Sequence, residues 1–149
     1  MHIFLSGKSG SGKTQDLVKH LNGKKLYGFQ TEKKDGKVYI FRPFSDPSEW
    51  VEAADLEQGK TYLAAFDAFG ASLLSNIPAG ADVIMDEIGF LEDAATIFLT
   101  AVETTIKRKD ITIYGVIKTE GSLLSERIKK MEGIRLVDYD KGERLKDVL

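Results

Sequence analysis

Apolar residues recur along the chain in short runs, and stretches with helical periodicity separate these runs. The first run, Ile3 to Leu5, is typical of a buried strand. Directly after a Gly/Ser/Lys-rich segment, Leu17, Val18 and Leu21 fall on one face of a helix predicted from Thr14 to Leu21. Asn22-Gly23 predicts the end of that helix.

The next part of the chain predicts an antiparallel hairpin. In "LYGFQTEKKDGKVYIFRP" two strand-like runs flank Asp35-Gly36, a dipeptide that favours the tight turns of β-hairpins. Beyond it, Asp46-Pro47-Ser48-Glu49 predicts a helix start with Asp46 as its cap.

Strands and helices then alternate to the end of the chain. Strands are predicted at Thr61 to Phe66, Ala81 to Met85, Ile111 to Ile117 and Ile134 to Tyr139. The helices between them are a short one capped by Asp67, one with Leu91, Ala95, Phe98 and Val102 on one face, and one from about Ser122 to Met131. This order predicts an α/β fold with a mostly parallel sheet, helices on both faces and an antiparallel hairpin excursion.

Composition limits the protein class. The 149 residues fit one domain, residues 1–149, and 42% hydrophobic with 30% charged residues is typical of a soluble globular protein. The net charge of -2 and the scattered lysines predict no nucleic-acid partner, and no apolar stretch is long enough for a membrane helix. The chain contains no cysteine, which agrees with a cytoplasmic location and excludes a thiolate metal site.

The segment "GKSGSGKT", Gly7 to Thr14, satisfies G-x-x-x-x-G-K-[ST] between a predicted strand and a predicted helix. In that context its backbone N–H groups and the helix N-terminus form a cradle for phosphate. Lys13 is expected to reach the terminal phosphates, and the Thr14 hydroxyl to bind Mg²⁺. ATP or another nucleoside triphosphate is therefore the predicted ligand. The predicted binding residues are Gly7, Lys8, Ser9, Gly10, Ser11, Gly12, Lys13 and Thr14.

A second signal is acidic. The strand before "DEIG" ends in Asp86-Glu87, at the edge where open α/β sheets bind ligands. Asp86 is predicted to hold Mg²⁺, and Glu87 to act as general base or to orient water. The alternative for Glu87 is that it complements the dipole of the following helix, the role we expect for Glu92. Gly89 fits D-x-x-G and is expected near the phosphate, while the chain has no N-K-x-D segment to read guanine.

Other residues give weaker signals. Lys118 and Thr119 follow a predicted strand and are candidates to face the terminal phosphate, or else form a solvated strand end. Thr31 and Glu32 on the hairpin are candidates to approach a substrate, with an exposed turn as the favoured alternative. No arginine has spacing that marks an arginine finger, which predicts slow turnover. His2 and His20 have no partner at metal-ligand spacing.

Five segments together resemble the small nucleoside-triphosphatase family of the THEP type: "HIFLSGKSGSGKT", "GFQTEK", "DVIMDEIGFLE", "IFLTAVETTI" and "ITIYGVI". The resemblance implies a RecA-like P-loop fold, Mg²⁺-dependent hydrolysis of nucleoside triphosphates to diphosphate and phosphate, and broad base selectivity. It assigns Gly7 to Thr14 to the phosphate loop and Asp86 to Gly89 to the acidic motif. The family's Asn-Arg near the C-terminus is replaced by Glu143-Arg144, so we expect Arg144 to cover the surface by its stem.

Two other functions use the same cradle. A nucleotide or small-molecule kinase would need an acceptor site, usually with an arginine-rich lid, and the sequence shows no arginine cluster. A nonenzymatic nucleotide-dependent module would use Asp86-Glu87 only to organise Mg²⁺. Hydrolysis is the favoured function, and the sequence identifies no protein partner.

Overall fold

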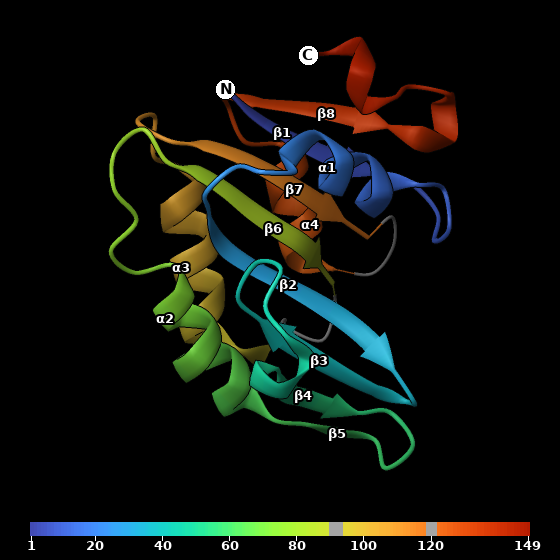
Figure 1. Ribbon diagram of the computed structural model, residues 1–149, viewed down its shortest axis with the longest axis vertical. Coiled ribbons are helices and arrows are strands. Elements are labelled where there is room, and N and C mark those ends of the chain that lie inside the picture. The colour runs from blue at the N-terminus through green and yellow to red at the C-terminus, as the bar shows by residue number, and fades with distance from the viewer. Residues whose placement is uncertain (90–93, 119–121) are drawn as a thin grey trace.

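The computed structural model describes residues 1–89, 94–118 and 122–149, in which eight strands form one sheet (Figure 1). The strands are β1 (His2–Ser6), β2 (Leu26–Lys34), β3 (Lys37–Phe41), β4 (Val51–Asp55), β5 (Lys60–Thr61), β6 (Asp82–Ile88), β7 (Thr112–Ile117) and β8 (Ile134–Asp138). Their order across the sheet is β5-β4-β3-β2-β6-β7-β1-β8. Pairing is parallel from β2 to β8 and antiparallel from β2 to β5. The predicted mostly parallel sheet with a hairpin excursion is confirmed.

The helices are short. They are α1 (Lys13–Leu21), α2 (Ala71–Leu73), α3 (Thr96–Ile106) and α4 (Leu123–Lys129), with the π-helix η2 (Ala65–Gly70) and the 3₁₀ helices η1 (Pro47–Glu49), η4 (Tyr139–Lys141) and η5 (Leu145–Asp147). Within the described parts of the chain, none of these helices has the length and apolar character needed to cross a membrane.

The two faces of the sheet bury different side chains, because successive residues of a strand point to opposite sides. Phe4 and Met85 join the larger core cluster, which α3 and α4 complete. Their neighbours Leu5 and Ile84 join a second cluster with the apolar face of α1. Figure 1 shows α1 on one side of the sheet and α2, α3 and α4 on the other, as the strand-helix alternation predicts.

A glycine allows β2 and β6 to approach closely. Gly28 has a φ of +102°, and a Cβ built on it would lie 2.1 Å from the carbonyl oxygen of Ile84. A larger residue at this position would therefore push the two strands apart. The close approach matters for function, because β2 and β6 together carry one wall of the site described below.

The segment between β3 and η2 differs from the prediction. The expected helix from Asp46 is the single turn η1, although the Asp46 carboxylate does cap it by accepting a hydrogen bond from the Ser48 N–H at 2.9 Å. The chain then enters β4, which the sequence did not predict, and the Trp50 ring stacks on Phe41 with centroids 4.1 Å apart. Stacking on the neighbouring strand holds this segment extended where the cap favoured a helix.

The predicted strand from Thr61 to Phe66 is also wrong. Only Thr61 belongs to a strand, and Phe66 lies in η2, buried against Phe98 with ring centroids 5.5 Å apart. Asp67 does not cap the helix that follows it. Its carboxylate accepts from the N–H of Phe98 at 3.0 Å, so it caps the start of α3 instead. Leu91, placed on the face of that helix, lies outside the described residues.

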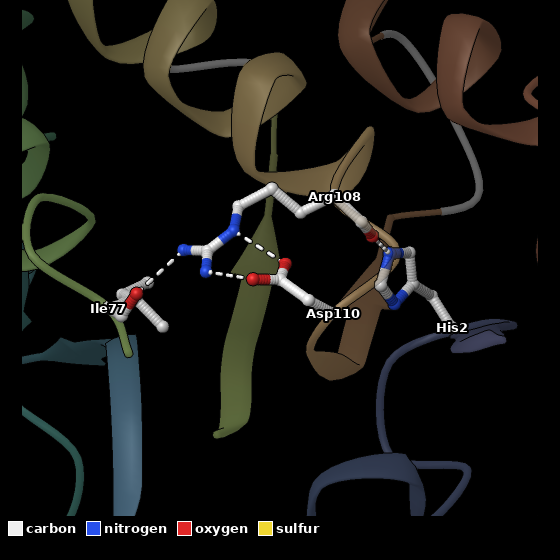
Figure 2. A network of polar contacts seen from close by, with 4 residues as sticks. All are labelled: His2, Ile77, Arg108 and Asp110. Carbon is white, nitrogen blue, oxygen red and sulfur yellow. Dashed lines mark hydrogen bonds and ion pairs between the residues drawn. The ribbon is translucent and has the colours of Figure 1, made fainter. Parts of the chain in front are cut away.

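A polar network closes the sheet edge that carries the N-termini of the strands (Figure 2). His2 Nε2 lies 2.8 Å from the Ile106 carbonyl and 2.9 Å from the Arg108 carbonyl, and His2 Nδ1 accepts from the Ile113 N–H at 3.1 Å. The Arg108 guanidinium holds both oxygens of Asp110 and the carbonyl of Ile77. These contacts tie the end of α3 to β1 and β7, and they require a neutral His2 with its proton on Nε2.

Candidate functional site

The Gly/Ser/Lys-rich loop runs from the end of β1 to the start of α1. Gly12, directly before the helix, has a φ of 94°, a conformation that favours glycine. The loop bends around the Lys13 side chain, which is only 7% exposed. Lys13 Nζ donates to the carbonyl of Gly7, to that of Lys8 at 2.8 Å and to Ser11 Oγ at 3.2 Å. The loop therefore holds a positive charge at its centre, next to the N-terminus of α1.

Carboxylates surround this ammonium group. Burial lowers the pKa of Lys13, while Glu87, Asp140 and Asp86 act in the opposite direction, Glu87 most strongly. Asp140 also supports the loop directly, since its Oδ1 accepts from the Lys8 N–H at 3.0 Å. The acidic end of β6 and the segment after β8 thus both face the loop.

Thr14 and Asp86 form the centre of the site. The Thr14 hydroxyl donates to Asp86 Oδ1 at 3.1 Å, which joins the first turn of α1 to the end of β6. Asp86 is 4% exposed, and burial raises its pKa to about 6, with the Thr14 hydrogen bond and Lys13 opposing and Glu87 adding to the rise.

This pair fits a magnesium ion. A hydroxyl and a carboxylate are hard oxygen donors, and Mg²⁺ commonly takes one or two such protein ligands while phosphates and water complete its shell. The described residues contain no group of three or more His, Cys, Asp or Glu that could hold a metal by themselves. Among the described residues, these donors suit an ion whose remaining ligands come from phosphate and water.

Glu87 is the extra residue of a β-bulge. The pairing of β6 with β7 passes from Asp86↔Val116 to Ile88↔Ile117, and the peptide bond between Asp86 and Glu87 is cis. A bulge re-aims the side chain that it carries and is frequent beside active sites. The Glu87 side chain, partly buried, lines the same cavity as Lys13 and Asp86.

That cavity has a volume of about 330 Å³ and lies between the loop, β2 and the end of β6. Its lining comprises residues 9–15 of the loop and α1, residues 31–33 of β2, and Asp86 and Glu87. Thr31 and Glu32 differ here from the expected exposed turn, because β2 continues to Lys34 and its last residues form a wall of the cavity. Their position follows from the pairing of β2 with β6, which sequence periodicity alone does not reveal.

Other predicted site residues lie at the same sheet edge. Gly7 and Lys8 supply carbonyls to Lys13, and Gly89 directly follows β6. Lys118 follows β7, and its N–H donates to the Ile88 carbonyl at 3.1 Å. Among the described residues, neither Gly89 nor Lys118 lines the cavity. Thr119 and Glu92 lie outside the described residues.

The C-terminal segment supports the loop from the other side. Tyr139 donates its hydroxyl to Asp16 of α1 and accepts from the Leu145 N–H at 3.2 Å. Burial, together with the Asp16 hydrogen bond, raises the pKa of Tyr139 to about 12. The Arg144 guanidinium lies 4.7 Å from the centroid of the Tyr139 ring and donates to the Tyr139 carbonyl at 3.1 Å. Arg144 therefore packs on the segment that supports the loop.

Comparisons with known proteins agree with this geometry. The model of a family described as NTPase matches residues 2–147. The crystal structure of THEP1 from the hyperthermophile Aquifex aeolicus has a TM-score of 0.79 at 20% identity, covering 100% of this chain and 97% of that chain. The solution structure of a human cancer-related nucleoside triphosphatase has a TM-score of 0.66 at 22% identity, covering 92% and 87%. A comparison with curated protein sequences gives no match.

Proposed function

Because the chain belongs to the NTPase family and is thus a nucleoside triphosphatase, we propose that it hydrolyses the terminal phosphate with Mg²⁺ in the cavity beside Asp86. The family that the sequence motifs resemble is confirmed. The observation that carries the proposal is the meeting of an ammonium group, a hydroxyl–carboxylate pair and a second carboxylate around one cavity.

The loop is the proposed phosphate cradle. Its N–H groups and the N-terminus of α1 favour the negative charge of the β- and γ-phosphates. Lys13 would exchange the carbonyls of Gly7 and Lys8 for phosphate oxygens, which are stronger acceptors because they are charged. Residues Gly7 to Thr14 are proposed to bind the nucleotide in this way.

Thr14 and Asp86 are the proposed ligands of Mg²⁺, with Asp86 acting directly or through a water. An ion held there would neutralise charge on the β- and γ-phosphates. Deprotonated Asp86 is needed for this role, and the positive charge of Lys13 supports that state against the effect of burial.

Glu87 is the proposed base. A water molecule attacks the γ-phosphorus while the bond from that phosphorus to the β-phosphate oxygen breaks, and the Glu87 carboxylate takes the proton of the water. Diphosphate nucleotide and phosphate leave, and Glu87 returns its proton to solvent. Gly89 and Lys118, at the same sheet edge, stay predicted contacts of the terminal phosphate.

Broad base selectivity is part of the proposal, and phosphate release by the purified protein tests it with ATP, GTP, CTP and UTP. We expect turnover with each nucleotide in Mg²⁺ and background release in EDTA. Formation of diphosphate nucleotide that needs a second substrate, with the phosphate found on that substrate and not in solution, would identify a kinase instead. Tight nucleotide binding without any turnover would identify a binding module.

A further inference from the structure

Glu87 has no register partner of its own in the sheet. Its neighbours Asp86 and Ile88 pair with Val116 and Ile117 of β7, and the pairing of β6 with β2 has Gln30↔Asp86 as its last pair. The register is therefore interrupted at Glu87 on the β7 side and ends just before it on the β2 side. A residue at such an interruption can turn, and the direction of its carboxylate turns with it.

One side chain of β2 contacts both backbone groups of Glu87. Thr31 Oγ1 accepts from the Glu87 N–H at 3.2 Å and donates to the Glu87 carbonyl at 3.4 Å. A single hydroxyl thus links the N–H and the carbonyl of the bulged residue to β2. Thr31 pairs with Ile40 of β3 on its other side, so a central strand of the sheet holds its backbone in place. The close approach of β2 to β6 at Gly28 brings the hydroxyl within reach.

We propose that Thr31 is a positioning residue for hydrolysis, which fixes the bulge at Glu87 so that its carboxylate points at the attacking water. This inference rests on the proposed role of Glu87 as base. Thr31 lines the same cavity, yet its hydroxyl is engaged by the Glu87 backbone, so it acts through Glu87 and not on the phosphate. Its contribution belongs to the transition state, because the cradle and the Thr14–Asp86 pair bind the nucleotide without it.

The test compares two substitutions that keep a β-branched or small side chain on the strand. Thr31→Val keeps the shape and removes the hydroxyl, whereas Thr31→Ser keeps the hydroxyl. Thr112→Val is the matched control, since Thr112 also lies on a sheet strand, paired with Asp82 at the far end of β6. Turnover, nucleotide affinity and hydrogen exchange of the Glu87 amide are measured for each variant in the intact protein.

Thr31→Val should lower kcat about 10-fold with nucleotide affinity within about threefold of wild type, as expected for one lost hydrogen bond that acts in the transition state. Thr31→Ser should stay within about threefold of wild type in kcat. The Glu87 amide should exchange about 10-fold faster in the valine variant. Equal kcat for the two variants, an equal fall in affinity and kcat, or unchanged amide exchange would each overturn the inference.

Combining Thr31→Val with Glu87→Gln tests the role of Thr31 separately from the proposed function. If Thr31 acts through Glu87, Thr31→Val should lower turnover less than about twofold in the Glu87→Gln background. The same 10-fold loss in that background would overturn the role of Thr31 and leave the function intact. Wild-type turnover in Glu87→Gln alone would remove the proposed base, and the inference with it.

Discussion

The Thr14 hydroxyl lies 3.1 Å from Asp86 Oδ1, although 72 residues separate the two along the chain. One belongs to the first turn of α1 and the other to the end of β6. In a parallel sheet, the helices that follow the strands begin at the same edge, where the strands end. The contact between Thr14 and Asp86 joins the proposed phosphate loop to the acidic segment at this edge. Asp86 is therefore both the proposed metal ligand and a buried carboxylate that affects the stability of the fold.

Asp86→Asn should weaken nucleotide binding in Mg²⁺ much more than binding in EDTA, because the substitution removes a charged oxygen ligand and keeps the shape of the side chain. Calorimetric titration of a nucleotide in both conditions measures the difference. Asp82→Asn, at the other end of the same strand, is the control and should leave both affinities near wild type. Equal losses in Mg²⁺ and EDTA would instead indicate damage to the loop.

The same substitution should stabilise the nucleotide-free protein at neutral pH. Asp86 has a pKa raised from 3.8 to about 6, so its contribution to stability is present below pH 3.8 and is lost as the pH rises through about 6. Such a shift corresponds to about 3 kcal/mol at neutral pH. Asparagine stays neutral, so Asp86→Asn should unfold at higher denaturant concentration at pH 7.5, with the advantage shrinking toward pH 4. An advantage that does not depend on pH would contradict this account.

Sequence patterns predicted the parallel part of the fold because β1, β6 and β7 are separate apolar runs, each followed by a helix. They failed between residues 46 and 70, where tertiary contacts override local preference. The Asp46 cap is real but the helix it starts ends after one turn, since Trp50 packs on the next strand. The apolar run that ends at Phe66 is compatible with either a strand or a helix. The packing of Phe66 against Phe98 favours the helix.

The candidate site likewise contains residues that a local sequence pattern marks and residues whose position depends on the tertiary structure. The loop and Asp86-Glu87 carry their chemistry in a local pattern, so the sequence alone is enough to propose them as site residues. No local pattern marks Thr31, because its proposed role depends on β2 lying next to β6 in the sheet. The sequence does not indicate the bulge at Glu87 either, because the bulge is defined by the register of β6 against β7.

Lys13→Ala should reduce nucleoside-triphosphate affinity about 10- to 100-fold, the effect of losing a charge-assisted hydrogen bond to phosphate. The buried ammonium also holds the carbonyls of Gly7 and Lys8, so the loop loses its central support. Titration with ATP measures the change. Lys24→Ala removes the same charge from an exposed turn and should leave affinity unchanged. A folded Lys13→Ala protein with wild-type affinity would exclude the phosphate cradle.

His2 should make the fold sensitive to acid. Burial lowers the pKa of His2 from 6.5, so the stability it contributes is present above pH 6.5 and is lost as the pH falls through its lower folded value. Protonation would also remove the acceptor for the Ile113 N–H. The free energy of unfolding should therefore fall more steeply below pH 6.5 in wild type than in His2→Gln. The other titrating groups are the same in both proteins, so their contributions cancel in this comparison. Parallel curves for the two proteins would show that His2 does not titrate as its contacts imply.

Glu87→Gln decides whether the cavity performs the hydrolysis as we propose. Glutamine keeps the size and hydrogen bonding of the side chain but cannot take a proton from water, so kcat should fall about 10²-fold while nucleotide affinity stays near wild type. The variant should accumulate bound triphosphate, which single-turnover hydrolysis of labelled nucleotide detects directly. Glu32→Gln removes the carboxylate that β2 contributes to the same cavity and serves as the comparison. Fast hydrolysis in Glu87→Gln together with slow hydrolysis in Glu32→Gln would transfer the role of base from the bulge to β2.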